Sequence, residues 1–181
     1  MERSLTHIAL FAALIAALGL VPRIDLAAGV PITAQSLGIM LCGTVLGARK
    51  GALAVLLFLL LVALGLPLLA GGRGGLGVFA GPSVGYLLGF PVAAFVAGWV
   101  MERTTLSPGW AAAAGAIIGG VGVLSLCGIV GLSIMLGKTL SEAAFIAMAF
   151  LPGDILKAGL AGVVTQSIAT ARPNALLSRA R

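Results

Sequence analysis

The segment Pro152-Gly153-Asp154-Ile155-Leu156-Lys157 places a carboxylate and an ammonium group one helical turn apart within an otherwise apolar run. Asp154 and Lys157 are three residues apart, so on a helix they share one face. An ionisable side chain costs about 2.5–3.5 kcal/mol at membrane depth, so such groups usually face a protein interior. The pair therefore predicts a polar site. Alternatively, Asp154 only complements the helix dipole, and Lys157 pairs with it or extends to the headgroups.

The composition around this segment is that of an integral membrane protein. Of 181 residues, 60% are hydrophobic and only 9% are charged, too few to cover the surface of a soluble domain. At about 20 apolar residues per crossing, this length allows roughly six spans. The net charge of +6 is scattered between apolar runs and forms no single stripe, which argues against nucleic-acid binding.

We therefore expect a single all-α integral membrane domain over residues 1–181, with six transmembrane helices. Apolar runs and Gly or Pro breaks place these helices at about residues 4–20, 32–46, 52–69, 82–101, 110–136 and 152–171. The first run has the length of a signal peptide, but the similar runs that follow favour a retained transmembrane helix.

The basic residues predict the orientation, because cytoplasmic loops carry an excess of Lys and Arg. With the N-terminus inside, the inner side carries Arg3, Arg49, Lys50, Arg103, Arg172, Arg179 and Arg181, and the outer side carries Arg23, Arg73 and Lys138. Both termini are thus expected in the cytoplasm. The outer side then gathers the loop after the first helix, a glycine-rich loop and the start of the last helix.

The glycine-rich loop, residues 70–81, favours a ligand site near the charged pair. Apolar side chains, Phe79 among them, alternate with its glycines, and Arg73 is its only charge. This pattern suits a compact cover over a cavity better than a flexible connector, which is the alternative.

Three polar side chains are expected near the same outer side. Tyr86, the only tyrosine, lies just inside the fourth run, where it serves as an interfacial anchor or a ligand hydrogen-bond partner. Thr33 and Gln35 open the second helix, where they either cap it or present polar groups to a ligand.

The first helix carries a stripe of small residues, Ala9, Ala13 and Ala17. Small residues spaced by four let helices approach closely in lipid. The stripe serves either packing within the chain or docking to a separate membrane subunit.

The sequence offers no recognisable catalytic or metal-binding set. His7 is the only histidine, and Cys42 and Cys127 match no zinc or redox spacing. The Leu-Gly-Lys-Thr run at 136–139 resembles the end of a phosphate-binding loop, but the required earlier glycine would fall at Leu132. We therefore expect no catalytic residue, metal or cofactor, and no ATP hydrolysis by this chain.

Three ordered motifs resemble those of the BioY family, and together they span essentially the whole chain. Residues 29–38 resemble its GVPIT-x-Q-(T/S)-LG signature, and residues 151–157 resemble its PGD-x-x-K motif. Between them, residues 65–90 resemble the stretch GLP…GG-x-GG…GP-(T/S)-x-GY-L-x-GF. Ala34 and Val84 are minor departures from the family pattern.

Members of this family are the biotin-capturing S components of energy-coupling factor (ECF) transporters. The resemblance implies a six-helix S-component fold in the lipid of the cell inner membrane, with biotin bound near the outer face. It also implies partnership with a transmembrane coupling subunit, which the alanine stripe would face, and with two cytoplasmic ATPase subunits. The resemblance carries biotin binding over to Asp154 and Lys157. From their positions in the sequence we expect the other biotin-binding residues to be Tyr86, Gln35, Thr33, Phe79 and Arg73.

The residues leave other points open. Either Lys157 or Arg73 could meet the biotin carboxylate, and a homo-oligomer is compatible with the sequence. The competing function is a self-sufficient secondary transporter or channel for a small organic solute that uses Asp154 for protons, although one acidic group offers no relay. An intramembrane enzyme would need a nucleophile and a base, and neither is recognisable.

Overall fold

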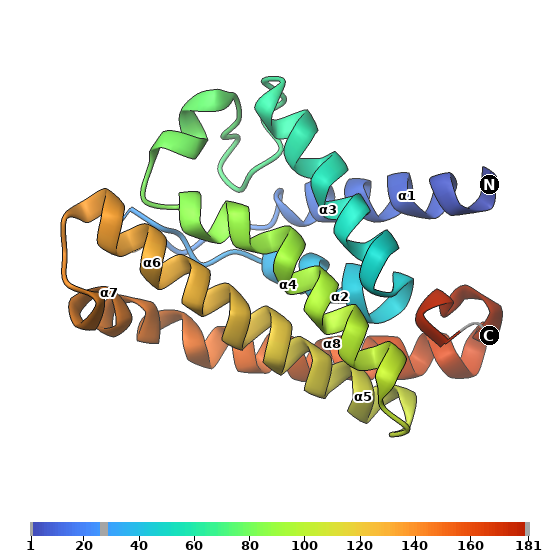
Figure 1. Ribbon diagram of the computed structural model, residues 1–181. Helices are drawn as coiled ribbons and strands as arrows, with labels where there is room; N and C mark the ends of the chain where they lie inside the picture. The colour runs from blue at the N-terminus through green and yellow to red at the C-terminus, as the bar shows by residue number, and fades with distance from the viewer. Residues whose placement is uncertain (1, 26–28, 180–181) are drawn as a thin grey trace.

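The computed structural model describes residues 2–25 and 29–179, without the side chains of residues 2 and 3. Its main helices are α1 (Glu2–Leu18), α2 (Gln35–Leu46), α3 (Ala48–Ala63), α4 (Val84–Arg103), α5 (Pro108–Gly115), α6 (Leu124–Leu136), α7 (Leu140–Ala147) and α8 (Leu151–Ala171) (Figure 1). Shorter turns are η1 (Leu76–Ala80), η2 (Ala116–Val123), η3 (Met148–Phe150), η4 (Pro173–Ala175) and η5 (Leu177–Arg179). Within the described residues, β pairing is limited to isolated bridges, Ile24 with Ile32 and Leu69 with Arg73.

Three helical runs of the described chain are long and apolar enough to cross a membrane. They are Val84–Arg103, Pro108–Leu136 and Leu140–Ala171. Ser4–Leu18 and Gln35–Leu46 are shorter apolar helices, and α3 adds 16 residues. The helices expected at about 4–20, 32–46, 52–69, 82–101 and 110–136 correspond to α1, α2, α3, α4 and the run α5–η2–α6, with shifted ends. Two arginines of the inner-side count, Arg3 by its side chain and Arg181 entirely, lie outside the described residues.

The helix expected at about 152–171 corresponds to α8, with Pro152 in its first turn. The stretch before it, expected as a connector that could hold a short helix, forms α7 and η3 and leads directly into α8. Gly137, with φ of 62°, ends α6, and Thr139 starts α7 through a capping box with Glu142. The Leu-Gly-Lys-Thr run is therefore a helix stop followed by a helix start.

The turn between α2 and α3 is shorter than expected. Gly47, with φ of +87°, is the only residue between the two helices. The N–H of Ala48 donates to the carboxylate of Glu102 at 2.8 Å, so the end of α4 caps the start of α3. At its other end α3 stops before Gly65, whose φ is +103°, and before Pro67.

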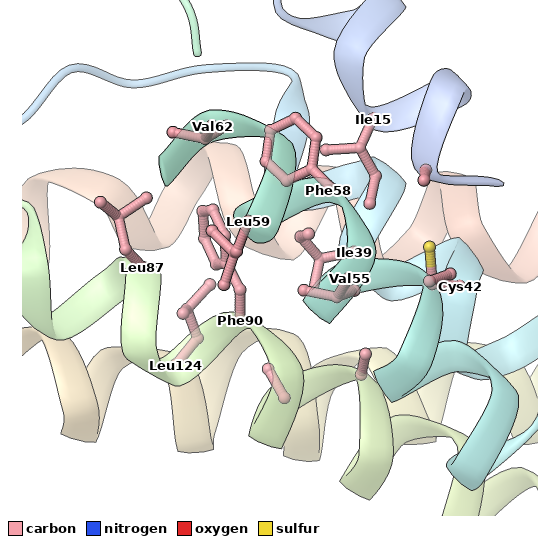
Figure 2. Close-up of a cluster of buried hydrophobic side chains, with 14 of the residues drawn as sticks. Ile15, Ile39, Cys42, Val55, Phe58, Leu59, Val62, Leu87, Phe90 and Leu124 are labelled. Carbon is pink, nitrogen blue, oxygen red and sulfur yellow. The ribbon is translucent and has the colours of Figure 1, made fainter. Parts of the chain in front are cut away.

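A buried apolar cluster joins the first half of the chain to α6. It is built from Ile15 of α1, Ile39 and Cys42 of α2, Val55, Phe58, Leu59 and Val62 of α3, Leu87 and Phe90 of α4, and Leu124 of α6 (Figure 2). A second cluster, with Met40, Ala112, Ala116 and Ala158 among its members, packs α2 against α5, η2 and α8. The segment η2 is a π-helix that the sequence did not predict.

The turns of the molecule gather at two ends. In Figure 1 the start of α1, the α2–α3 turn, the α4–α5 turn and η4–η5 lie at one end, and η1 and the α6–α7 turn lie at the other. At the first end, Ser178 Oγ donates to the backbone oxygen of Thr44 at 2.6 Å, and Leu176 is buried. We call these the η4–η5 end and the η1 end.

Close helix approach makes Gly43 in α2 a sensitive position. An added Cβ there would overlap the carbonyl oxygen of Ala94 and lie 2.9 Å from the backbone nitrogen of Gly98, neither of which can rotate away. We expect Gly43→Ala to destabilise the protein by about 1–3 kcal/mol, as overpacking does. Thermal unfolding of the purified protein measures this as a lower Tm.

Gly159 in α8 is the matched control, because nothing lies within 4 Å of a Cβ added there. Gly159→Ala should leave Tm unchanged or raise it slightly, since alanine favours a helix over glycine. Equal Tm values for the two variants would contradict the close packing of α2 on α4.

Candidate ligand-binding site

A narrow cavity lies toward the η1 end of the bundle. The cavity volume is about 60 Å³, and all the empty space at this place, open solvent included, is about 540 Å³. The lining comes from the segment 30–36, from Leu69 and Arg73, from Ser83 and the first two turns of α4, from the first residue of α6, and from Phe150 and the first two turns of α8. The predicted ligand contacts that line it are Asp154, Lys157, Tyr86, Gln35, Thr33 and Arg73.

The charged pair meets a third polar residue at the deep side of the cavity. Lys157 Nζ donates to Asp154 Oδ1 at 3.0 Å and to Ser36 Oγ at 2.9 Å, and Ser36 Oγ donates to the same Oδ1 at 3.2 Å. The side chains of Lys157 and Asp154 are only 14% and 10% exposed. Lys157 therefore points into the protein and does not extend to the headgroups. None of these bonds uses Oδ2 of Asp154.

Tyr86 presents a phenol without a protein partner. Its hydroxyl is buried and accepts or donates no hydrogen bond to any described residue. The ring is fixed by Phe150, 5.5 Å away between centroids, and by the close approach of Gly128. A buried polar group without a partner costs about 1–3 kcal/mol. This hydroxyl is therefore ready for a ligand or a water molecule.

Gln35 and Thr33 are engaged with the backbone at the start of α2. The Gln35 Nε2 donates to the oxygens of Ile15 and Leu68, each at 3.1 Å, and its Oε1 accepts from the N–H of Ala70 at 3.0 Å. Thr33 Oγ1 accepts from the N–H of Gln35 at 3.3 Å. Both residues edge the cavity, but the Gln35 amide is committed to the protein.

Arg73 is the cation at the mouth of the cavity. Its Nε donates to the oxygen of Ala70 at 3.3 Å, and that oxygen also accepts from Arg23 at 2.9 Å. Arg23 pairs with Asp25 at 2.8 Å, whereas no carboxylate of the described residues forms an ion pair with Arg73. Burial, followed by repulsion from Arg23, lowers the pKa of Arg73, while Asp25 raises it. An arginine still keeps its charge, so this position attracts an anion.

Phe79 and the alanine stripe lie away from the cavity. Phe79, in η1, does not line it and packs instead against the apolar cluster of α1–α4. Ala9, Ala13 and Ala17 are exposed along α1, so the described chain leaves the stripe uncovered.

Ser36 is the functional candidate that sequence reasoning missed. It lies next to Gln35 within the first motif, but its partners are 118 and 121 residues away. A serine at the start of an apolar helix is usually a cap. Only the packing of α2 against α8 shows that its hydroxyl joins the charged pair.

Comparison with known proteins assigns the chain. The model of the BioY family matches residues 2–174. The "Biotin transporter BioY" of Rhodobacter capsulatus is 51% identical, with 99% of this chain and 100% of the relative covered. That of Rhizobium etli is 48% identical, with 94% and 95% covered.

A solved structure agrees over almost the whole fold. The "S-component for biotin from an ECF-type ABC transporter" superposes with a TM-score of 0.88 and 32% identity, covering 93% of this chain and 92% of that one. The helical bundle described above is thus an S-component fold of a multi-pass membrane protein, and the chain belongs to the BioY family.

Proposed function

We propose that this chain is the biotin-binding membrane subunit of a vitamin-uptake transporter. The observation that carries the proposal is the Asp154–Lys157–Ser36 cluster, which lies inside an apolar bundle and borders a cavity. Relatives of high identity are biotin transporters, and the similar solved structure is an S-component for biotin. Ionisable groups inside a membrane bundle usually mark a functional site, even when they pair with each other as these two do.

The ureido ring of biotin matches this cluster chemically. Asp154 would accept from the ring N–H groups through Oδ2, which the bonds to Lys157 and Ser36 leave unused. Lys157 would donate to the ring oxygen in exchange for its bond to Ser36. The phenol of Tyr86 gains its missing partner when a ligand oxygen or nitrogen comes within reach.

The carboxylate of biotin is assigned to Arg73. Lys157 already has Asp154 as a counter-ion at 3.0 Å, so a second anion would gain little there. Arg73 lacks such a partner among the described residues and stands at the mouth, where a flexible acyl tail would end. Bidentate pairing with a carboxylate also suits a guanidinium better than an ammonium.

Binding requires the cavity to widen. Ligand pockets commonly measure about 300–1,000 Å³, whereas the cavity volume here is about 60 Å³. The glycine-rich loop, residues 70–81, is the wall best suited to move, because it has few side chains to repack. Phe79 would contact the ligand only if it left the core cluster in the same movement. Thr33 and Gln35 complete the polar edge.

Transport would depend on partner proteins. We propose six spans and cytoplasmic termini, so that the η4–η5 end faces the cytoplasm and the η1 end faces outward. The exposed stripe Ala9, Ala13 and Ala17 would contact a transmembrane coupling subunit. Two ATPase subunits would supply the energy for import.

Loss of either charge should weaken biotin binding. Asp154→Asn and Lys157→Met each remove a charge-assisted hydrogen bond, worth about 1.5–3 kcal/mol, so we expect Kd to rise about 10- to 150-fold. Isothermal titration of the purified protein measures this. Lys138→Met is the control, because Lys138 lies in the turn before α7, outside the cavity lining, and should bind as the wild type does. Absence of saturable binding by the wild type would refute the proposed function.

Arg73 should make binding depend on the biotin carboxylate. The wild type is expected to bind biotin more tightly than biotinamide, by roughly the 10- to 150-fold of a charge-assisted bond. Arg73→Gln should abolish this preference without weakening biotinamide. Arg103→Gln is the control, since Arg103 stacks on Trp99 in the last turn of α4. A preference that survives in Arg73→Gln would move the carboxylate elsewhere.

The alanine stripe should matter only for assembly. Ala13→Leu adds bulk to an exposed face, so it should reduce co-purification with the coupling subunit and biotin uptake by cells, with an unchanged Kd for biotin. Ala149→Leu, at another exposed alanine in η3, should affect neither measurement. Normal assembly of Ala13→Leu would exclude the stripe from the interface.

A further inference from the structure

The Gln35 side chain joins three segments that are far apart in sequence. Its amide bonds the oxygen of Ile15 in the last turn of α1, and the oxygen of Leu68 and the N–H of Ala70 in the loop after α3. The residue is 2% exposed, so water offers no replacement for these bonds. Both donors and the acceptor of the amide are therefore used to hold α1 against that loop at the start of α2.

This joint, the three segments held by the Gln35 amide, also reaches the ligand site at two places. Ser36, the next residue of α2, bonds Asp154 and Lys157 at the deep side of the cavity. Ala70, which the Gln35 oxygen holds by its N–H, offers its own oxygen to Arg73 at the mouth. A ligand that contacts both the charged pair and Arg73 would therefore act on Gln35 through Ser36 on one side and through Ala70 on the other.

The end of α1 and the loop after α3 are in close contact. Gly19 follows the last residue of α1, and a Cβ added there would lie 2.5 Å from the oxygen of Leu68 and 3.0 Å from Gln35 Nε2. The chain can therefore pass this point only because residue 19 has no side chain. A larger shift of the loop away from α1 has to be followed by α1, or it breaks the bonds to Gln35.

We propose that Gln35 is a positioning residue that makes the placement of α1 depend on whether the cavity is occupied. The ligand part rests on the proposed function, while the restraint on α1 does not. Because α1 carries the exposed alanine stripe, the surface offered to a membrane partner would then differ between the empty and the loaded protein. Linkage requires the converse: fixing α1 strengthens ligand binding.

The test follows α1 by the distance between two spin labels in the full-length protein in lipid nanodiscs. Leu5 on α1 and Leu126 on α6 are each 65% exposed, and cysteines placed there in a Cys127→Ser background can carry the labels. Cys42 is fully buried and out of reach of the reagent. Pulsed electron–electron resonance gives the distance distribution with and without biotin.

Two variants break the joint by different routes, and neither removes a proposed contact to biotin from the charged pair or Arg73. Gln35→Glu keeps the acceptor for Ala70 but cannot donate to Ile15 and Leu68. Gly19→Ala forces α1 away from the loop from a position outside the cavity lining. The matched controls are Gln166→Glu, at the other glutamine of the chain, which likewise keeps its acceptor for Gly109, and Gly159→Ala in open space.

We expect biotin to narrow or shift the distribution in the wild type and in both controls. In Gln35→Glu and Gly19→Ala the distribution should be broad with or without biotin, and Kd for biotin should rise about tenfold, within the usual range of coupling between sites. If either Gln35→Glu or Gly19→Ala fails to fold, the other variant still tests the proposal.

Three results would overturn the proposal. The first is that biotin does not change the α1 distances in the wild type. The second is that both variants keep the wild-type distances and their response to biotin. The third is that the variants raise Kd without changing the α1 distances. The last would mean that Gln35 acts on the ligand alone. A wild type that does not bind biotin would instead refute the proposed function, and broadening in the ligand-free variants would still measure the restraint on α1.

Discussion

The burial of Asp154 against Lys157 is the constraint on which the rest of this structure depends. Two opposite charges one helical turn apart can remain inside an apolar bundle only when they satisfy each other and find further hydrogen bonds. Ser36 supplies these from α2, so the start of α2 has to lie against the start of α8. That contact places residues 30–36, the loop after α3 and the first turn of α4 around one cavity.

The sequence was most informative where chemistry and spacing are local. Charge scarcity and apolar runs placed a helix near each expected span, although α3 ends at Ala63 instead of near residue 69. The spacing of Asp154 and Lys157 correctly put both on the side of α8 that lines the cavity. The sequence also predicted correctly that a loop separates the first two helices. These features follow from composition and from the three-residue spacing on a helix, which need no knowledge of tertiary contacts.

Other features depend on contacts that a single sequence does not reveal. Pro152 lies in the first turn of α8, as expected, but the capping box at Thr139 adds a preceding helix, α7, that continues through η3 into α8. Gln35 was expected to cap α2 or to face a ligand, yet its amide bonds three backbone groups of distant segments. Phe79 shares a loop with Arg73 but turns toward the core cluster.

The η4–η5 end has a practical consequence for protein engineering. Thr44 is among the last residues of α2, whose backbone oxygens lack helical partners, and the Ser178 hydroxyl supplies one. Leu176, almost fully buried, belongs to the second apolar cluster, which packs on α2. A truncation drawn at the last apolar helix would look harmless on a hydropathy plot. It would nonetheless remove the Ser178 bond to α2, so a truncation has to keep residues 173–179.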